Sequence, residues 1–320
     1  MTSIPSSAKR VILAGGSGFI GRQLARRLSG QGCDVVILTR SPRRESHAPG
    51  GTPGVREVAW DGRTCGPWWS ELEGADGVVN LAGRTVNCRP TPSNIAEVIA
   101  SRVDSARALG EACGRCAKPP RAWVQTGALA YYGDTGDEIL DETSPAGVGH
   151  AVGICVPWES SMRKALPDTT RGTILRIGIV LGMDGGALPT LVRLVRLGLG
   201  GSAGSGRQWV SWIHADDMLS LIEFALFQST LSGPVNACTA FPVTNQDFMR
   251  EIRRAVGRPW SPPAPSFAVR LGAWLMGTDA RLALTGRRCH PRKLIDAGFQ
   301  FRHPQLRGAL QDLLGGRKTA

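Results

Sequence analysis

Apolar, β-branched runs recur along the first half of this chain, and more polar stretches separate them. Such runs are typical of strands that are buried on both faces of a parallel sheet. Between the fourth and fifth runs, residues 93–117 carry Ile95, Ile99, Val103 and Leu109 at helical spacing. Alternating strands and helices predict an α/β fold with a doubly wound parallel sheet. The runs cover residues 10–14, 34–39, 55–60, 77–81, 121–126 and 172–181.

The first run leads directly into a glycine-rich loop that opens a helix. Gly15, Gly18 and Gly21 satisfy the pattern G-x-x-G-x-x-G, and Gly16 completes the related G-x-G-x-x-G. The pattern alone is weak in a chain with 41 glycines. Between a strand and a helix at the start of a βαβ unit, it predicts a Rossmann-like dinucleotide site.

Backbone atoms would do most of the binding at this loop. The glycines let the chain approach a pyrophosphate, and the first N–H groups of the helix supply the positive end of its dipole. Ile20, Leu24 and Leu28 are spaced at four in that helix, and Gly30 and Gly32 can end it. The expected cofactor contacts in the loop are Gly15, Ser17, Gly18, Phe19, Ile20 and Gly21.

The residue after the second run indicates which dinucleotide binds. An NAD site would place Asp or Glu about twenty residues past the loop, to accept from the ribose 2′-hydroxyl. This chain has Arg40 there, followed by Ser41, Arg43 and Arg44. A guanidinium pairs with phosphate oxygens, so we expect NADP(H) rather than NAD(H). The missing acid is stronger evidence than the presence of Arg40. Arginine is frequent in this chain, since only five of the 38 basic residues are Lys, so an arginine can stand at this position by chance.

Further candidates follow the other predicted strands. Ligands of such sheets bind at the carboxyl ends of the strands. Asp61 follows the third run, residues 80–83 close the fourth, and residues 126–127 close the fifth. Those expected to contact the cofactor are Asp61, Leu81, Ala82, Gly83, Thr126 and Gly127.

Beyond residue 180 the pattern changes. A glycine-rich stretch spans 198–206, and Pro259, Pro262, Pro263 and Pro265 mark a hinge-like stretch before the last helices. We expect those helices to pack as a cap over the strand ends, because their apolar faces need a surface. The apolar positions at helical spacing are Phe248, Ile252, Val256, Leu271, Leu275, Leu310 and Leu314.

Two sequence patterns in this region suggest a nucleophile but lack its context. Residues 200–204 match G-x-S-x-G, yet no strand enters them and no apolar helix leaves them, as a nucleophile elbow requires. Ser211, His214 and Asp217 are triad residue types on one short segment, and that spacing does not place them for proton relay.

Positive charge is concentrated near the end of the chain. Of the net +12, residues 1–229 contribute +3 (24 basic, 21 acidic) and residues 230–320 contribute +9 (14 basic, five acidic). A basic region attracts nucleic acid, anionic substrates or membrane surfaces. With no zinc-finger, helix-turn-helix or aromatic RNA-binding pattern, nucleic acid is not expected as the main partner. We expect a small-molecule substrate. The positive charge suits an anionic substrate or partner, and a solvated basic surface with no ligand explains it equally well.

Cysteine usage and hydropathy indicate the compartment. Eight cysteines are scattered through predicted strands and helices, which suits reduced, mostly buried thiols rather than a disulfide framework. Cys113 and Cys116 have no second pair nearby, so no metal site is expected. No apolar run is long enough to span a membrane, and the N-terminus lacks a signal peptide's apolar core. We therefore expect a cytoplasmic protein with no membrane partner.

Together these motifs resemble the extended and atypical short-chain dehydrogenases/reductases, and more narrowly the NAD-dependent epimerase family proteins of the 39U type. The resemblance covers nearly the whole chain. It implies an NADP-binding Rossmann-like domain over 1–240, with 183–208 a glycine-rich excursion near the substrate cleft. A small, mostly helical C-terminal domain of unknown function would follow over 241–320. The matching segments are the glycine loop, 80–83, 131–133, 176–182, 185–188, 198–208, 211–217, 233–236, 291–294 and 298–299.

The chain departs from the superfamily at the catalytic pair. There, a Tyr-x-x-x-Lys pair and a Ser or Thr carry the chemistry, and the Lys charge lowers the Tyr pKa. Neither Tyr131 nor Tyr132 has a Lys four residues later. Aligning on residues 158–159 places the Tyr position near Ala151 and the Lys position near Cys155. The Ser position falls near residues 126–127.

Three hypotheses remain open. The first is an oxidoreductase or epimerase-like enzyme with rearranged catalysis, in which Tyr131 or Tyr132 donates the proton and Thr126 orients the carbonyl. The second is a non-catalytic NADPH-binding sensor or interaction protein, with both tyrosines as packing residues. The third is a module that binds nucleic acid or another anionic partner through its basic C-terminal part. The sequence sets neither the substrate nor the oligomeric state.

Overall fold

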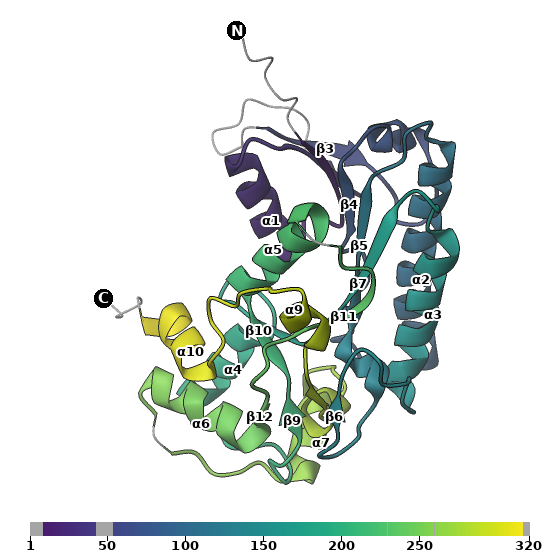
Figure 1. The fold of residues 1–320 in the computed structure, drawn as a ribbon. Helices are drawn as coiled ribbons and strands as arrows, with labels where there is room; N and C mark the ends of the chain where they lie inside the picture. Colours follow the sequence, from purple (N-terminus) through teal and green to yellow (C-terminus); the bar gives the residue numbers. More distant parts are fainter. Residues whose placement is uncertain (1–8, 43–53, 229, 259, 316–320) are drawn as a thin grey trace, which may run out of the picture.

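A parallel sheet forms the upper part of the molecule (Figure 1). The computed structural model describes residues 9–42, 54–228, 230–258 and 260–315. The strand order is β3-β2-β1-β4-β5-β7-β11, so the chain starts in the middle and winds outward both ways. This confirms the predicted doubly wound, Rossmann-like fold. The seven strands are β1 (Arg10–Ala14), β2 (Asp34–Thr39), β3 (Val55–Ala59), β4 (Gly77–Asn80), β5 (Ala122–Ala128), β7 (Arg171–Ile177) and β11 (Gly233–Ala237).

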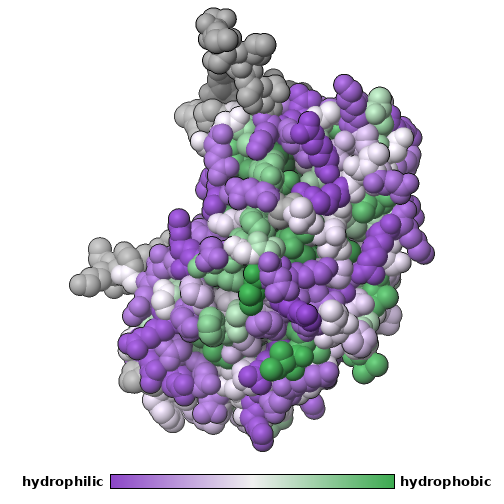
Figure 2. Space-filling view, in the orientation of Figure 1, coloured by the Kyte–Doolittle hydropathy of each residue, from purple (hydrophilic) through white to green (hydrophobic). Residues whose placement is uncertain are grey.

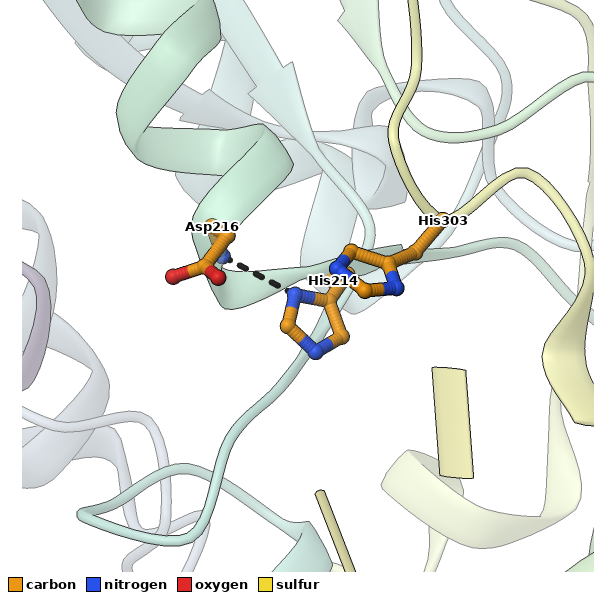
Figure 3. A group of neighbouring side chains, drawn as sticks. All are labelled: His214, Asp216 and His303. Carbon is orange, nitrogen blue, oxygen red and sulfur yellow. Dashed lines mark hydrogen bonds between the residues drawn. The ribbon is translucent and has the colours of Figure 1, made fainter. Parts of the chain in front are cut away.

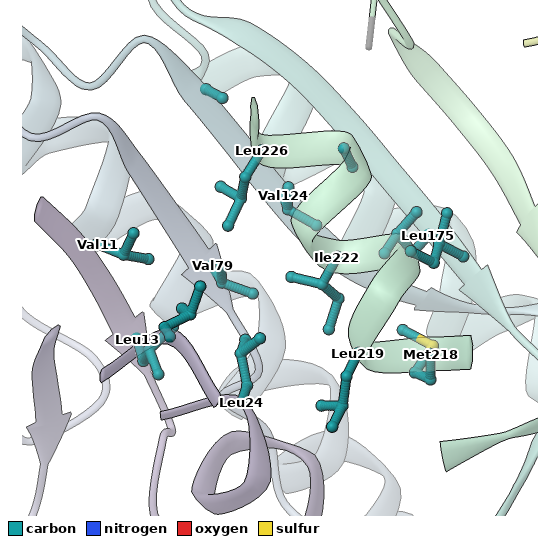
Figure 4. Packing of buried hydrophobic residues seen from close by; sticks show 14 of the residues in the cluster. Val11, Leu13, Leu24, Val79, Val124, Leu175, Met218, Leu219, Ile222 and Leu226 are labelled. Carbon is teal, nitrogen blue, oxygen red and sulfur yellow. The ribbon is translucent and has the colours of Figure 1, made fainter. Parts of the chain in front are cut away.

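Both faces of the sheet are buried, because side chains alternate along each strand. Val11 and Leu13 of β1 join a core with α1 (Phe19–Gly30) and α5 (Ala215–Glu223), seen in Figure 4. Ile12 and Ala14 point to the opposite face. There they share a core with α2 (Pro92–Arg115), and α3 (His150–Ala165) lies beside α2 in Figure 1. The continuous apolar runs predicted from the sequence follow from this double burial.

One predicted strand is divided. The run 172–181 forms β7 and then β8 (Ile179–Leu181), which leaves the main sheet and pairs with β10 (Trp212–His214). At Gly178 the backbone N–H donates to the carbonyl of Ala237. A Cβ atom at this position would lie 2.5 Å from the backbone carbonyl oxygen of Ser211, so the close approach of the two segments requires glycine. The prediction of a single strand was therefore wrong, and β11 was absent from the predicted runs.

The C-terminal region contributes to two cores. Phe248 and Ile252 of α6 (Asn245–Val256) pack with Leu310 of α10 (Leu306–Gly315) and with α4 (Leu188–Arg196). The described members of this core lie outside the seven-stranded sheet, so the expected cap over the strand ends stays a prediction. Phe299 joins the sheet core. The domain boundary at residue 240 stays a prediction.

Leu271 and Leu275 do not follow this pattern. Both lie on α7 (Ser266–Leu275), and they are 56% and 68% exposed. The expectation that they pack against a surface of the chain was wrong.

The remaining elements are short. These elements include a π-helical turn that continues α5. They are β6 (Ile139–Leu140), β9 (Trp209–Val210), β12 (Val243–Thr244), β13 (Arg288–Cys289), α8 (Arg281–Leu284), α9 (Arg292–Asp296), the 3₁₀ turns Pro67–Leu72 and Leu129–Tyr132, and the π turn Phe224–Gln228.

The cysteines agree with the expected reduced thiols. All eight cysteines are free thiols, and five of them are buried. Among the described residues, no helix combines the length and apolar character needed to cross a membrane.

Candidate functional site

The glycine loop joins β1 to α1 at the carboxyl edge of the sheet. Gly15 has a φ of +78°, a left-handed conformation that suits glycine. A Cβ atom there would lie 2.8 Å from the backbone nitrogen of Ala82, so the turn also packs tightly against the end of β4. At Gly21 a Cβ atom would lie 2.5 Å from the Cα of Gly16, so this glycine lets α1 approach the loop.

Gly18 leaves open the space that an anion needs. A Cβ atom there would meet only the carbonyl oxygen of Gly15, at 3.5 Å. Gly18 caps α1 without a side-chain hydrogen bond, and the first turn carries no acidic residue. The N–H groups of the first turn are thus available to an anion, and a pyrophosphate fits this cradle.

Phe19 anchors the cradle to a segment far along the chain. A Cβ atom at Gly182 would lie 2.6 Å from its ring, and one at Gly185 would lie 2.7 Å from it. Both glycines therefore make room for the ring, between α1 and the segment that leads into α4. Sequence reasoning assigned Phe19 to the cofactor and missed this role of Gly182 and Gly185.

Arg40 follows β2 and is exposed. It forms no hydrogen bond or ion pair with any residue that the structure describes, so its guanidinium is available to a ligand. The neighbouring Ser41 N–H donates weakly, over 3.5 Å, to the hydroxyl of Thr39. Arg43 and Arg44 lie outside the described residues.

The end of β4 is shaped by Asn80, which is completely buried. Its amide oxygen accepts from the Ala82 N–H at 3.0 Å, and its amide nitrogen donates to Gln125 and Ser105. The Leu81 N–H donates to the carbonyl of Ala14 in β1. This network holds residues 81–83 against the glycine loop, where the sequence placed Leu81, Ala82 and Gly83.

Two other candidates already hold bonds within the chain. The carboxylate of Asp61 accepts from the backbone of Arg63 and Thr64 and from the Thr64 hydroxyl, so it fixes its own turn. The hydroxyl of Thr126 donates to the carbonyl of Asn80 at 2.9 Å and ties β5 to β4. Gly127 is buried next to it.

The two tyrosines differ in surroundings. Tyr132 is 1% exposed; its hydroxyl donates to the Asn236 amide oxygen at 2.7 Å and accepts from Arg176 at 2.8 Å. Burial raises the pKa of Tyr132, and the nearby Arg176 only partly opposes this. Tyr131 is half-buried, and the Arg176 guanidinium lies 3.5 Å from its ring centre. The Tyr131 hydroxyl has no hydrogen bond to the part of the chain that the structure describes.

Arg176 therefore contacts both tyrosines, and Glu159 holds it in place. The guanidinium donates to both Glu159 oxygens, at 2.8 and 2.9 Å, and both side chains are almost fully buried. Sequence reasoning quoted Glu159, Arg176 and Asn236 as family motifs and gave them no role. Arg176 of β7 and Asn236 of β11 lie side by side because the two strands pair at these positions.

The positions that align with the superfamily pair lie on α3. Cys155 is buried, and burial raises the pKa of its thiol to about 12. A neutral thiol supplies neither the positive charge of a lysine nor a proton at neutral pH. Ala151, one turn earlier, offers no polar group.

His214, Asp216 and His303 bring possible metal ligands together (Figure 3), with their ligand atoms within 4.8 Å of one another. However, the Nδ1 atom of His214 accepts from the Asp216 N–H at 3.0 Å, which places the ring proton on Nε2 in the neutral tautomer. Nε2 then faces Asp312 at 3.3 Å, so His214 has no lone pair to spare. The two rings stack, with centres 3.9 Å apart. We interpret this group as a helix cap.

The residues of the apparent triad are not arranged for relay. The carboxylate of Asp217 accepts from the backbone N–H groups of Arg302 and His303 and so holds the C-terminal segment. The Ser211 hydroxyl donates to the carbonyl of Arg287. Both side chains have structural roles.

Comparisons with known proteins agree with this geometry. Residues 11–237 match the family model described as NAD dependent epimerase/dehydratase family, and residues 264–313 match a domain of unknown function, DUF1731. The mouse epimerase family protein SDR39U1 is 34% identical over 95% of this chain and 99% of its own length. YfhF of Bacillus subtilis is 30% identical over 97% and 99%.

A solved structure of human SDR39U1 (isoform 2) with NADPH superimposes with a TM-score of 0.83 at 31% identity. It covers 96% of this chain and 100% of its own. MoeE5, solved with UDP-glucose and NAD, shares the fold at 20% identity and a TM-score of 0.73. The resemblance inferred from the sequence is confirmed.

Proposed function

The chain belongs to the NAD dependent epimerase/dehydratase family, and from this premise we propose that it is an NADP(H)-dependent oxidoreductase or epimerase-like enzyme without a Tyr-x-x-x-Lys pair. The observation that carries the proposal is the open cradle at Gly18, together with an Arg40 side chain that has no ion pair or hydrogen bond to the residues that the structure describes. The NADPH in the human relative's structure supports the choice of cofactor. NADP(H) supplies or accepts the hydride, and residues of the chain would handle the proton.

Tyr131 is the better of the two candidates for proton donor. Its hydroxyl is free of partners among the described residues, whereas that of Tyr132 is held on both sides. The Arg176 guanidinium packs against the Tyr131 ring and would hold it in position. Thr126, at the end of the neighbouring strand β5, would orient the substrate carbonyl once its hydroxyl releases the carbonyl of Asn80.

We also propose that the substrate is anionic. The support for this is a buried cation, Arg102, near the end of β4. Arg102 of α2 is 8% exposed and forms no ion pair with a described carboxylate. Its guanidinium donates to the carbonyls of Arg84 and Val98, which leaves the positive charge without a counter-charge among the described residues. A Cβ atom at Gly83 would lie 3.2 Å from its guanidinium carbon, so the charge lies under the end of β4. An unneutralised buried cation is costly unless an anion compensates it. A carboxylate or phosphate on the substrate would do so.

Steady-state turnover tests the enzyme hypothesis. NADPH oxidation should be slow on aldehydes, ketones and nucleotide sugars, because the superfamily's acid is missing. Tyr131→Phe should reduce residual turnover about 10²–10⁴-fold, the contribution of a positioned general acid. Tyr132→Phe is the matched control and should lower stability while it retains the rate. Equal rates for Tyr131→Phe and the unmodified protein would exclude Tyr131 as the acid, and absence of turnover in the unmodified protein would instead support a non-catalytic NADPH-binding protein.

A further inference from the structure

Helix α7 has its apolar stripe on the outside. Phe267, Leu271, Trp274 and Leu275 follow the i, i+4, i+7, i+8 spacing of one helical face. They are 73%, 56%, 62% and 68% exposed. The small Ala273 is the buried residue of this helix. A helix of a globular protein normally turns its large apolar residues inward, so this stripe lacks a covering apolar surface among the residues that the structure describes.

The segment that leads into α7 is held by residues 201–204. Ala203 bridges to Ala264, and a Cβ atom at Gly201 would clash with the carbonyl of Pro262. Figure 2 shows hydrophobic (green) residues in the lower part of the molecule, where Figure 1 places α7.

Positive charge lies close to this surface. Arg270 is exposed on α7 itself, and the Arg89 guanidinium lies 6.0 Å from the Trp274 ring centre. Asp279, which follows the helix, is already paired with Arg281. A second copy of the chain would bring the same arginines together with no carboxylate to meet them, which opposes self-association. The charge instead complements a negative surface.

We propose that α7 docks this protein on the surface of a bilayer that contains anionic phospholipids. Aromatic and aliphatic residues on one face with arginines beside them are typical of helices that lie in the headgroup region. Trp and Arg suit this depth, since each has an apolar body and a polar end. Docking at the surface requires no spanning helix.

Vesicle sedimentation with the NADPH-loaded full chain tests the proposal. The protein should pellet with vesicles of 7:3 phosphatidylcholine and phosphatidylglycerol, and should not pellet with phosphatidylcholine alone. Raising the salt concentration should weaken binding, because the arginines are exposed. The double variant Phe267→Ser/Trp274→Ser should bind at least tenfold more weakly. Phe241→Ser, at a half-exposed aromatic outside α7, is the matched control and should bind normally.

Other occupants give different results. Dimerisation in sedimentation velocity that Phe267→Ser/Trp274→Ser abolishes would assign the stripe to a second copy and overturn the proposal. Absence of vesicle binding would also overturn it. Retention on immobilised polyglutamate, lost in Arg270→Glu, would in that case indicate an acidic protein partner. NADPH affinity, measured in every variant, separates these outcomes from a failure of the proposed function.

Discussion

The guanidinium of Arg176 forms two parallel hydrogen bonds with the carboxylate of Glu159, at 2.8 and 2.9 Å, and both side chains are almost completely buried. Glu159 comes from α3 and Arg176 from β7, so the pair joins a helix to the sheet beside the tyrosines. Arg163 adds a third hydrogen bond to the same carboxylate from the exposed side. The pair thereby fixes the position of the cation that both Tyr131 and Tyr132 contact.

Glu159→Gln should destabilise the protein strongly. The substitution leaves the Arg176 charge buried without a counter-charge, and breaking such a pair costs about 3–5 kcal/mol. Denaturant unfolding would measure the loss. Glu111→Gln removes the carboxylate of an exposed pair with Arg115 on α2 and should cost less than about 1 kcal/mol. Similar losses in the two variants would contradict the role given to Glu159.

Two glycines of the loop should respond differently to alanine. Gly15→Ala places a side chain at a φ of +78° and against Ala82, so it should cost about 2 kcal/mol or more in stability. In Gly18→Ala the added methyl group meets only the carbonyl oxygen of Gly15, at 3.5 Å, so the variant should lose little stability. The same methyl group would occupy the space proposed for the pyrophosphate. Thermal unfolding and NADPH titration would separate these effects. Unchanged NADPH affinity in Gly18→Ala would contradict the placement of the cofactor.

The sequence predicted the sheet well because its signals are local. A β-branched run, a glycine loop and helical spacing lie within a few residues of one another, as they do from Val11 to Leu28. The split at Gly178 was not predictable in this way, since it depends on backbone contacts with Ser211 and Ala237, far along the chain. The same limit applies to α7, whose spacing indicated an apolar face and could not show that Leu271 would point into solvent.

The candidate site shows a similar division. The cradle was predictable because Gly15, Gly18 and Gly21 act through their own backbone. Side-chain networks were not, because their partners come from separate strands: Tyr132 meets Asn236, which lies 104 residues later. The sequence does not indicate which of the two tyrosine hydroxyls forms hydrogen bonds. The Tyr132 hydroxyl does so because the pairing of β7 with β11 brings Arg176 and Asn236 together beside it.

Arg40 should determine the choice between cofactors. NADP(H) should bind more tightly than NAD(H), because the exposed guanidinium can pair with the 2′-phosphate. Loss of one charge-assisted contact costs about 1.5–3 kcal/mol, or roughly tenfold or more in affinity. Arg40→Asp should erase or reverse the preference in a fluorescence titration. Arg26→Asp, the same charge change on the exposed side of α1, should not. Equal affinities for both cofactors in the unmodified protein would refute the assignment.

Acidification should loosen the contact between His214 and the C-terminal segment. Burial, with a smaller effect of His303, lowers the pKa of His214 below its usual value, against the opposing charges of Asp216, Asp312 and Asp217. The native state then prefers the neutral ring, while the unfolded chain takes up a proton near pH 6.5. The free energy of unfolding is therefore highest above that pH and falls as the pH drops toward the lower, native pKa. His214→Asn keeps an oxygen that can cap α5 and removes the titration. Urea unfolding at pH 7.5, 6.5 and 5.5 should show a smaller loss of stability in the variant. The same pH dependence in both proteins would mean that other groups govern the acid response.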